Sequence, residues 1–352
     1  MTAITKRQML AGMAGGALGG LAAAPVAAQD LSPYERELHD AAKAKPEVTW
    51  YTGQMQAEPS EAAAAAFGVR FPGLKVNVVR STSQVAFQRL SQDMRAGVAQ
   101  CDVFSSTDYS HAAFLKREGK LLQYRPKNAD GLLDVIRDFD RDNFFQVTYL
   151  GVYMLARQSA KVSEADAPRT WKDLLDPKWR DALAVGHPGF SGAIGLWCIS
   201  MRKMYGWDYF KALEKNRPQI GRSSADPVTT INVGERIVGV CIPSATTLLS
   251  ASRGNPLTLI YPSDGTLLVP SPSGILKDAP HPVAAKLFME FMAGPAYSQA
   301  CLPFFHDSLR SDVAQPPGAK AISEIKSILP TGEETEAGMP EVKELWRETF
   351  GI

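Results

Sequence analysis

Three short β-rich runs near the start of the chain alternate with two helical stretches, and this order restricts the possible folds more than any other feature. The β-rich runs are "EVTWYTG", "GLKVNVVR" and "CDVFSSTD", and the helical stretches between them are "PSEAAAAAFGVRF" and "SQVAFQRLSQDMRAG". Strand, helix, strand, helix, strand is typical of a parallel sheet with helices on its faces. We therefore predict an α/β fold.

The middle of the chain repeats this alternation. "FFQVTYLGVYMLAR" is β-rich, the stretch from "TWKDLLDPKW" to "SMRKMYG" contains helical patterns around a short strand, and "GERIVGVCIPSATT" returns to a strand. A chain of 352 residues is long enough for two ordinary domains. The sequence thus predicts two α/β units, each with a mainly parallel sheet flanked by helices.

Polar residues and glycines follow the predicted strands of both units. Ligands of parallel sheets bind at the carboxyl ends of the strands, and a turn that opens a helix adds unpaired backbone N–H groups that attract anions. The expected ligand-binding residues are Thr52, Gly53, Gln54, Arg80, Ser81, Thr82, Ser83, Ser105, Ser106, Thr107, Ser191, Gly192, Arg222, Ser223, Ser224, Ser244, Thr246, Thr247 and Asp264.

The chemistry of these residues favours an anionic ligand. Hydroxyl and amide donors beside Arg80 or Arg222 form an environment for a phosphate, a phosphonate or a carboxylate. Asp264 either accepts from an amine of a zwitterionic ligand or is only a turn residue. Ordinary alternatives exist for the others, because hydroxyls also cap helices and each Arg also forms surface ion pairs. Aromatic residues near the strand ends either shield the ligand or point into the core; they are Trp50, Tyr51, Tyr109, Phe190 and Tyr261.

The net charge limits the partners of the protein, and the first thirty residues predict its location. With 38 Lys and Arg against 37 Asp and Glu, no excess of charge favours nucleic acid or anionic lipid as a partner. A basic start at Lys6 and Arg7, a Gly/Ala-rich stretch and small residues before Gln29 predict a cleaved export signal at residues 1–28, Tat-like or Sec, and a periplasmic mature protein. The alternative is a retained anchor, although the run is short and Gly-rich for a bilayer span.

The four cysteines give no metal motif. Cys101, Cys198, Cys241 and Cys301 are far apart and form no C-x-x-C pair, which argues against a zinc site. An exported chain permits disulfides, but buried free thiols are an equal alternative. No cofactor is expected.

Several stretches, taken in order, resemble a known family. They are "VTWYTG", "FPGLKVNVVRSTSQVAFQRL", "DVFSSTDYSHAAFLKREGKL", "TWKDLLDPKWRDALAV" and "YPSDGTLLVPSPSGILKDAPHPVAAKLFMEFM". This order is similar to the extracellular solute-binding proteins of ABC importers, in the branch that contains ferric-iron-binding proteins. The resemblance covers residues 46–310, and "W-x-DLLDPKW" and "YPSDGT" are its most specific parts.

The resemblance implies a periplasmic binding protein of type II, with two lobes that clamp a ligand between them. It places lobe 1 at residues 46–148 plus 262–310, lobe 2 at 149–261, and a C-terminal helical segment at 311–352 that packs on a lobe. The crossing strands are expected near Thr148–Leu155 and Leu257–Ser263. It also implies that the protein is a monomer whose partners are a small-molecule solute and a membrane permease, without nucleic acid.

One departure from the family pattern concerns the ligand. Ferric-binding relatives place adjacent tyrosines after the strand that here leads into "CIPSATTLLSAS", a segment without Tyr. A hard trivalent cation is best held by anionic oxygen ligands, so we expect no metal, and a ferric ion or an iron chelate remains the alternative ligand. An exported hydrolase is the alternative of another class. His187, Ser191 and Asp226 are its nominal triad, but "GFSGA" does not match G-x-S-x-G.

Overall fold

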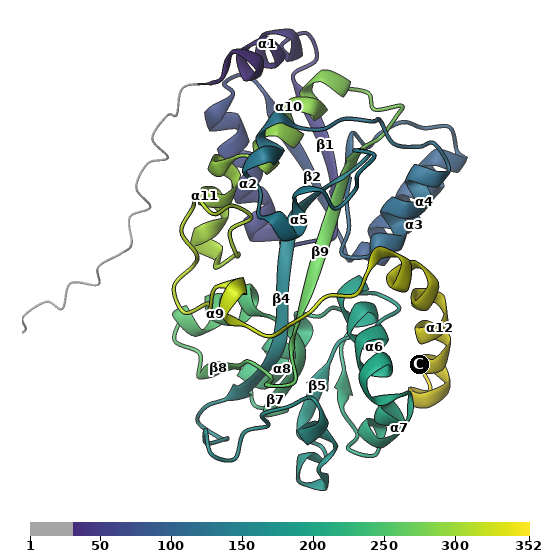
Figure 1. Cartoon of the computed structure of the whole chain (residues 1–352), viewed down its shortest axis with the longest axis vertical. Coiled ribbons are helices and arrows are strands. Elements are labelled where there is room, and N and C mark those ends of the chain that lie inside the picture. Colours follow the sequence, from purple (N-terminus) through teal and green to yellow (C-terminus); the bar gives the residue numbers. More distant parts are fainter. Residues whose placement is uncertain (1–30) are drawn as a thin grey trace, which may run out of the picture.

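The computed structural model describes residues 31–352, so the predicted export signal at residues 1–28 lies outside the described residues. Two lobes are stacked along the long axis of the molecule, and a mixed sheet of ten strands runs through both (Figure 1). The strands are β1 Glu47–Thr52, β2 Lys75–Arg80, β3 Val103–Ser105, β4 Gln146–Gln158, β5 Leu183–Val185, β6 Gln219–Ile220, β7 Val238–Pro243, β8 Leu257–Ile260, β9 Thr266–Ile275 and β10 Ser327–Ile328.

The helices cover the sheet in both lobes. Those of lobe 1 are α1 Pro33–Ala42, α2 Ala57–Arg70, α3 Ser83–Arg95, α4 Tyr109–Arg117, α5 Asp134–Arg137, α10 Pro282–Ala293 and α11 Pro295–Cys301. Those of lobe 2 are α6 Gly192–Tyr205, α7 Asp208–Glu214, α8 Asp226–Asn232 and α9 Ser244–Ser252, and the chain ends in α12 Gly332–Phe350. Short 3₁₀ helices are η1 Lys127–Gly131, η2 Lys172–Leu175, η3 Pro177–Trp179, η4 Leu302–Phe304 and η5 Ile322–Glu324.

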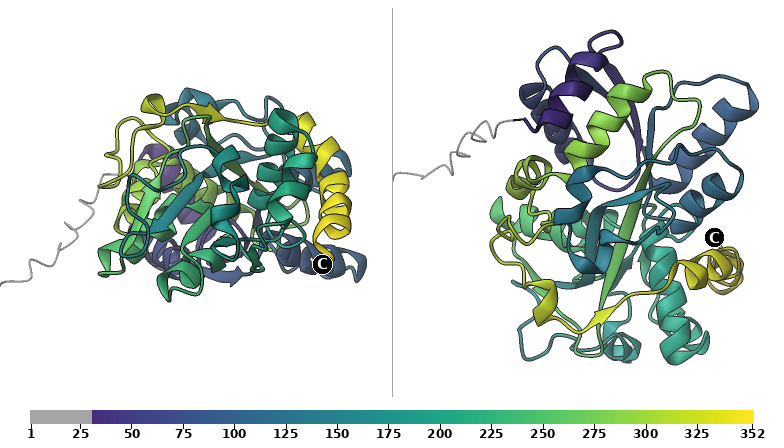
Figure 2. Two further views of the ribbon diagram at one scale, coloured as in Figure 1. Left: turned by 90° about the horizontal axis from the view of Figure 1, so that it is seen from below. Right: turned by 45° about the horizontal axis from the view of Figure 1, so that its top comes forward.

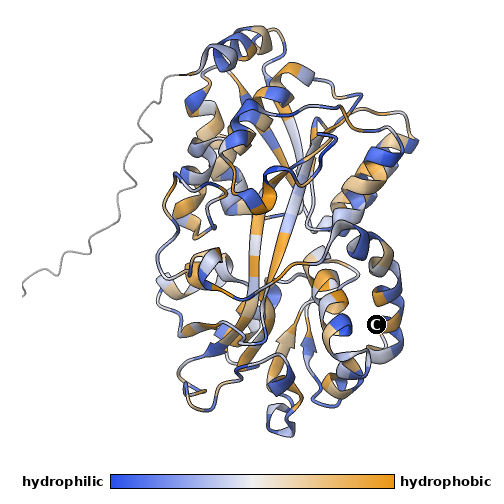
Figure 3. Cartoon of the chain, in the orientation of Figure 1, coloured by the Kyte–Doolittle hydropathy of each residue, from blue (hydrophilic) through white to orange (hydrophobic). Residues whose placement is uncertain are grey.

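The predicted alternation is confirmed in lobe 1. Strands β2, β1 and β3 are parallel neighbours, and α2 and α3 connect them. Trp50 of β1 is fully buried and packs edge-to-face on Phe288 of α10, while Phe67 of α2 contacts the same ring. Hydrophobic residues also run along β4 at the centre of the molecule, where Figure 3 shows them between more hydrophilic outer helices. Burial of these aromatic and aliphatic side chains holds the helices on the sheet.

Two long antiparallel strands join the lobes. Both strands, β4 and β9, have one end in lobe 1. There Gln146 of β4 lies opposite Ser273 of β9, and β9 also pairs with β3. The other end of β4 pairs with β7 and β8 in lobe 2. The expectation of a crossing at Leu257–Ser263 is wrong, because Leu257–Ile260 is the separate strand β8 at the lobe 2 end of β4. β9 contains Pro270 and Pro272, which lack the N–H that a strand ladder uses, yet both lie opposite residues of β4 in the ladder.

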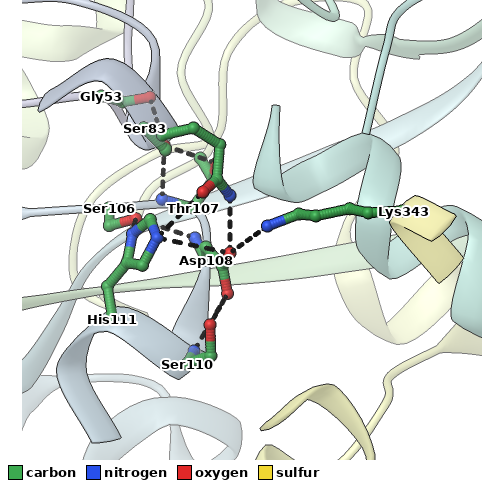
Figure 4. A network of polar contacts seen from close by, with 9 residues as sticks. Gly53, Ser83, Ser106, Thr107, Asp108, Ser110, His111 and Lys343 are labelled. Atoms are coloured by element: carbon green, nitrogen blue, oxygen red, sulfur yellow. Dashed lines mark hydrogen bonds and ion pairs between the residues drawn. The ribbon is translucent and has the colours of Figure 1, made fainter. Parts of the chain in front are cut away.

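The C-terminal helix contacts both lobes rather than one. Met339, Val342 and Trp346 of α12 are buried against lobe 2, where α12 packs on α6 and α7. Figure 2 shows this helix, in yellow, beside the teal helices of lobe 2. Its other contact is α4 of lobe 1. There Lys343 Nζ lies 3.8 Å from Oδ2 of Asp108, a carboxylate that is fully buried (Figure 4).

The cysteines are all free and buried, which is the thiol alternative of the sequence analysis. Within residues 31–352, no helix is both long and apolar enough to span a bilayer.

Lys343→Met tests the attachment of α12 to lobe 1. Burial alone would raise the pKa of Asp108, but His111 and Lys343 together with hydrogen bonds from Ser110 and Gln84 hold it below its usual value, so the carboxylate is ionised. Removing the ammonium group leaves this buried charge with fewer partners, and we expect the free energy of unfolding to fall by about 1–3 kcal/mol. Denaturant titration measures it.

Lys203→Met is the matched control, because Lys203 forms an exposed ion pair with Glu334 at the start of the same helix. Such pairs contribute about 0–1 kcal/mol. Equal losses in the two variants would show that Lys343 does not attach α12 to lobe 1.

Candidate functional site

A cavity of about 30 Å³ lies between the lobes, where strand ends of both meet. β1, β2 and β3 end toward it from lobe 1, and β7 ends toward it from lobe 2. Of the expected ligand-binding residues, those that line it are Gly53, Gln54, Arg80, Thr82, Ser83, Thr107, Ser191, Ser223, Ser224 and Thr246. The structure therefore brings together residues from every predicted turn except that of Asp264, while their role in binding stays a prediction.

The remaining expected residues lie outside the lining: Thr52, Ser81, Ser105, Ser106, Gly192, Arg222, Ser244, Thr247 and Asp264. Several of them bond to the protein itself. Ser105 Oγ accepts from Trp50 Nε1 at 2.7 Å, and Ser106 Oγ lies 2.9 Å from His111 Nδ1. The Arg222 guanidinium stacks 4.6 Å from the centre of the Phe190 ring. Of the five aromatic residues named in the sequence analysis, Phe190 is the one that lines the cavity.

Asp264 is placed in a different part of lobe 2. Its Oδ2 accepts from the backbone N–H of Trp171 at 2.8 Å and from the hydroxyl of Tyr205 at 2.6 Å. The carboxylate thus holds the chain at the start of η2, with no contact to the cavity. Its partners are remote in sequence, so the Asp-Gly dipeptide alone gave no sign of this packing role.

The hydroxyls at the start of α9 divide into two groups. The Ser244 hydroxyl donates to Asp307 Oδ2 at 3.4 Å, and the Thr247 hydroxyl donates to the carbonyl of Pro243 at 3.0 Å. The N-cap of α9 is Pro243, without a side-chain capping bond, so these hydroxyls do not cap the helix. Thr246 alone of the three lines the cavity, and its hydroxyl has no hydrogen-bond partner in the described part of the chain.

The lobe 1 wall is built from three strand-end turns in direct contact. Ser83 Oγ donates to the carbonyl of Gly53 at 3.1 Å and accepts from the N–H of Thr107 at 3.0 Å (Figure 4). A Cβ on Gly53 would lie 2.5 Å from the Cα of Ser83, so only glycine permits this approach. The turn after β1 is therefore fixed against the start of α3.

Two tyrosines on β4 form a wall that the sequence analysis missed. Tyr149 and Tyr153 line the cavity from one face of the strand, on either side of Gly151. A Cβ on Gly151 would lie 2.5 Å from Tyr153 Cε2 and 3.0 Å from Tyr149 Cε1. Burial raises the pKa of both phenols above their usual value, so they are neutral donors rather than phenolates. The spacing Tyr-x-Gly-x-Tyr was the available signal.

His306 is the second residue that was missed. Its side chain lines the cavity although the residue is only 7% exposed, and its Nδ1 has no hydrogen-bond partner among residues 31–352. Thr82 Oγ1, also in the lining, is likewise buried without a partner in that range. Burial lowers the pKa of His306 to about 4, so the ring is neutral near pH 7. Leaving such groups unpaired costs about 1–3 kcal/mol each, which favours a polar ligand.

Arg80 supplies the charge of the cavity. Its Nε donates to the carbonyl of Met55 at 3.1 Å and its Nη2 donates to Gln56 Oε1 at 3.0 Å. Burial lowers the pKa of this guanidinium, but an arginine stays protonated. In the described chain Arg80 forms no ion pair with a carboxylate, and the lining itself contains no Asp or Glu. Arg80 is therefore a partly buried cation that no carboxylate contacts directly, although the negative charge of Asp226 acts on it from a greater distance.

Over residues 31–352, no group of three His, Cys, Asp or Glu side chains is placed to hold a metal ion. Two residues of the nominal triad make other contacts: His187 Nδ1 accepts from the N–H of Gly189, and Asp226 accepts from the Ser223 hydroxyl. The third, Ser191, lines the cavity. The arrangement offers hydrogen-bond donors around one cation.

Residues 48–301 match the family model of the bacterial extracellular solute-binding proteins. The chain belongs to this family. An uncharacterized protein of Haemophilus influenzae is 24% identical over 240 residues, which are 66% of this chain and 68% of that protein.

Solved structures share its fold. The periplasmic binding protein AfuA of Actinobacillus pleuropneumoniae, with exogenous fructose-6-phosphate bound, is 22% identical over 87% of this chain and 98% of its own, with a TM-score of 0.78. Iron-bound HitA of Pseudomonas aeruginosa is 20% identical over 86% and 99%, with a TM-score of 0.75. The ferric binding protein of Campylobacter jejuni is 18% identical over 87% and 99%, with a TM-score of 0.72. The solute-binding protein thus has the two-lobed fold of type II periplasmic binding proteins.

The lobes of the solute-binding protein touch beside the cavity. A Cβ on Gly192, the first residue of α6 in lobe 2, would lie 2.6 Å from the N of Asp108 and 2.7 Å from the carbonyl carbon of Thr107 in lobe 1. Both are backbone atoms that cannot swing aside, so a side chain at this position would push the lobes apart.

Gly192→Ala should weaken ligand binding at least tenfold, since contacts from both lobes exist together only when the lobes meet. Small-angle scattering with saturating ligand should give a larger radius of gyration than for the parent. Gly195→Ala in the same helix is the control, because its added methyl group would meet only the flexible end of the Met339 side chain. If Gly192→Ala kept the affinity and the radius of gyration of the parent, the close contact of Gly192 with Thr107 and Asp108 would not be needed for binding.

Proposed function

We propose that this protein is the periplasmic substrate-binding component of an ABC importer and captures a small solute with a compact anionic group between its lobes. The observation that carries the proposal is Arg80, whose partly buried charge lacks a carboxylate partner in the described chain and faces a cavity of hydroxyl and amide groups. The unpaired Thr82 hydroxyl and His306 ring add two more groups for the ligand.

The physical reason is the cost of removing an anion from water. That cost is offset only when nearly every ligand oxygen receives a hydrogen bond. Arg80 provides a charged donor, and hydroxyls of Ser, Thr and Tyr surround it from both lobes. Burial raises the pKa of nearby Asp307 to about 7, which reduces the negative charge behind Ser244. The surroundings of the cavity thus favour a negative ligand.

An amino acid is a weaker candidate than a plain anion. A ligand amine needs an acceptor, and the expected one, Asp264, bonds to Trp171 and Tyr205 instead. The lining holds no other carboxylate. A phosphate ester, a phosphonate or an organic acid therefore fits best, and the fructose-6-phosphate in AfuA is an example of such a ligand on the same fold.

Ferric iron is the second candidate, because two structures of this fold are an iron-bound protein and a ferric binding protein. The absence of carboxylates from the lining argues against a bare ferric ion, because a hard trivalent cation is best held by anionic oxygen ligands. Export through the signal at residues 1–28, a monomeric state and docking to a membrane permease complete the proposal.

Thermal melting of the purified mature protein against separate ligands tests this function. Phosphate, phosphonates and organic acids are one set, amino acids a second and ferric salts with and without citrate a third. At least one anion should raise the melting temperature by mass action and be recovered chemically unchanged. A shift with ferric salt alone, or recovery of an altered compound, would contradict the proposal.

Thr246→Val tests the site directly. The substitution keeps the shape and removes a hydroxyl that points to the ligand, and a hydrogen bond to a charged group contributes about 1.5–3 kcal/mol. Affinity for the anion found by melting should fall roughly ten- to a hundredfold by calorimetric titration, at about 1.4 kcal/mol per decade, while the unliganded melting temperature changes little.

Thr247→Val is the matched control, since the neighbouring hydroxyl donates to the carbonyl of Pro243 within its own helix. It should leave affinity close to the parental value. Equal affinities in both variants would exclude Thr246 from the binding site.

A further inference from the structure

A second cavity of about 350 Å³ adjoins the first and opens along lobe 2 between α8 and α9. The two share Gln56, Arg80, Ser223 and Thr246, so Arg80 stands at the boundary between them. A ligand bound to Arg80 can therefore extend in either direction. The first cavity is called the inner compartment below, and the second the outer compartment.

The two compartments differ in size, so they would hold different parts of a ligand: a small anionic group, called the head, and the remainder, called the body. A cavity needs at least about 10–15 Å³ to hold one water molecule. The inner compartment, at about 30 Å³, therefore admits only a few atoms beside its donors. The outer compartment, at about 350 Å³, has room for a body of several carbons. A solute larger than a bare oxyanion must place its remainder there while the lobes stay in this arrangement.

The other charged groups of the outer compartment are Asp226 and Arg253. Asp226 Oδ2 accepts from the backbone N–H groups of Arg222 at 2.7 Å and Ser223 at 3.0 Å. Arg253 Nη2 donates to both carboxylate oxygens of Glu58, at 3.0 and 2.8 Å, which joins α9 of lobe 2 to α2 of lobe 1 at the rim. Arg80 is thus the cation at the boundary whose direct hydrogen-bond acceptors are neutral, and the anionic head belongs beside it.

The neutral groups of the outer compartment are both donors and acceptors. The side chains of Thr229 and Asn232 on α8 line it and make no hydrogen bond to any residue that the structure describes. Ser250 and Asn255 on the opposite side bond to one another at 2.9 Å. Thr229 is exposed and Asn232 is half-buried, so water reaches both side chains. A hydroxyl-bearing body can replace the hydrogen bonds of that water, whereas a purely apolar body would displace the water without replacing them.

We infer that the ligand is an oxyanion carried on a neutral, hydroxyl-bearing body, with the oxyanion in the inner compartment and the body in the outer one. This rests on the proposed function and narrows it, because free inorganic anions and apolar acids are excluded as the preferred solutes. Thr229 and Asn232 then determine which body is accepted, and Arg80 binds the head of every candidate.

Calorimetric titration with matched pairs of probes tests the inference on the mature protein. Each pair joins a bare head to the same head on a hydroxylated body: inorganic phosphate with a hexose 6-phosphate, and acetate with gluconate. In at least one pair the hydroxylated member should bind at least tenfold more tightly. Equal binding within both pairs would overturn the inference while the proposed function stands, and binding of no anion at all would overturn both.

Variants of α8 locate the body. Thr229→Val and Asn232→Ala should each weaken the hydroxylated probe roughly two- to tenfold, as expected for a neutral hydrogen bond, and leave the affinity of the bare head unchanged. Thr230→Val is the control on the same helix, because its hydroxyl donates to the carbonyl of Asp226 at 3.2 Å. The inference would be wrong if the two α8 variants bound the bare head and the hydroxylated probe with equally reduced affinity. It would also be wrong if both variants bound the hydroxylated probe as tightly as the parent does.

Discussion

The antiparallel pairing of β4 with β9 is the constraint on which the rest of the molecule depends. The ladder runs from Gln146 opposite Ser273 to Tyr153 opposite Leu267, and strands of lobe 1 and lobe 2 continue the sheet from its two ends. Because both lobes are built on this one pair, the carboxyl ends of their parallel strands face each other across its middle. Tyr149 and Tyr153 lie at that point, so the joining strand also supplies part of the cavity lining.

The charged groups around the cavity differ in the partners that they contact. Carboxylates near it are kept occupied: Asp108 by Lys343 and hydrogen bonds, Asp226 by backbone N–H groups, and Glu58 by Arg253. Arg80 receives only the carbonyl of Met55 and the amide oxygen of Gln56. A cation solvated by neutral acceptors keeps nearly all of its attraction for an anion, whereas a cation in an ion pair would have to exchange partners.

Sequence patterns predicted the alternation of strands and helices in lobe 1 and many residues of the cavity lining, because strand ends and hydroxyl-rich turns are local features. They missed Tyr149 and Tyr153, since a long β-rich run appears wholly buried and only pairing decides which face meets a cleft. His306 is far in sequence from its neighbours in the lining. The role of Asp264 and the position of the second crossing strand were predicted wrongly for the same reason: the partners of the Asp264 carboxylate and the pairing of β9 with β4 are set by tertiary packing.

The contacts between the lobes outside the cavity also bear on how a ligand acts. Arg253 with Glu58 and Arg117 with Glu336 are exposed pairs, each of which contributes about 0–1 kcal/mol. They are too weak to hold two lobes together against the entropy of an open ensemble. The α12 helix differs, because its apolar residues are buried in lobe 2 while Lys343 reaches a buried carboxylate in lobe 1. It therefore connects the two lobes independently of the cavity, and the hydrogen bonds of the proposed anion would add to this connection.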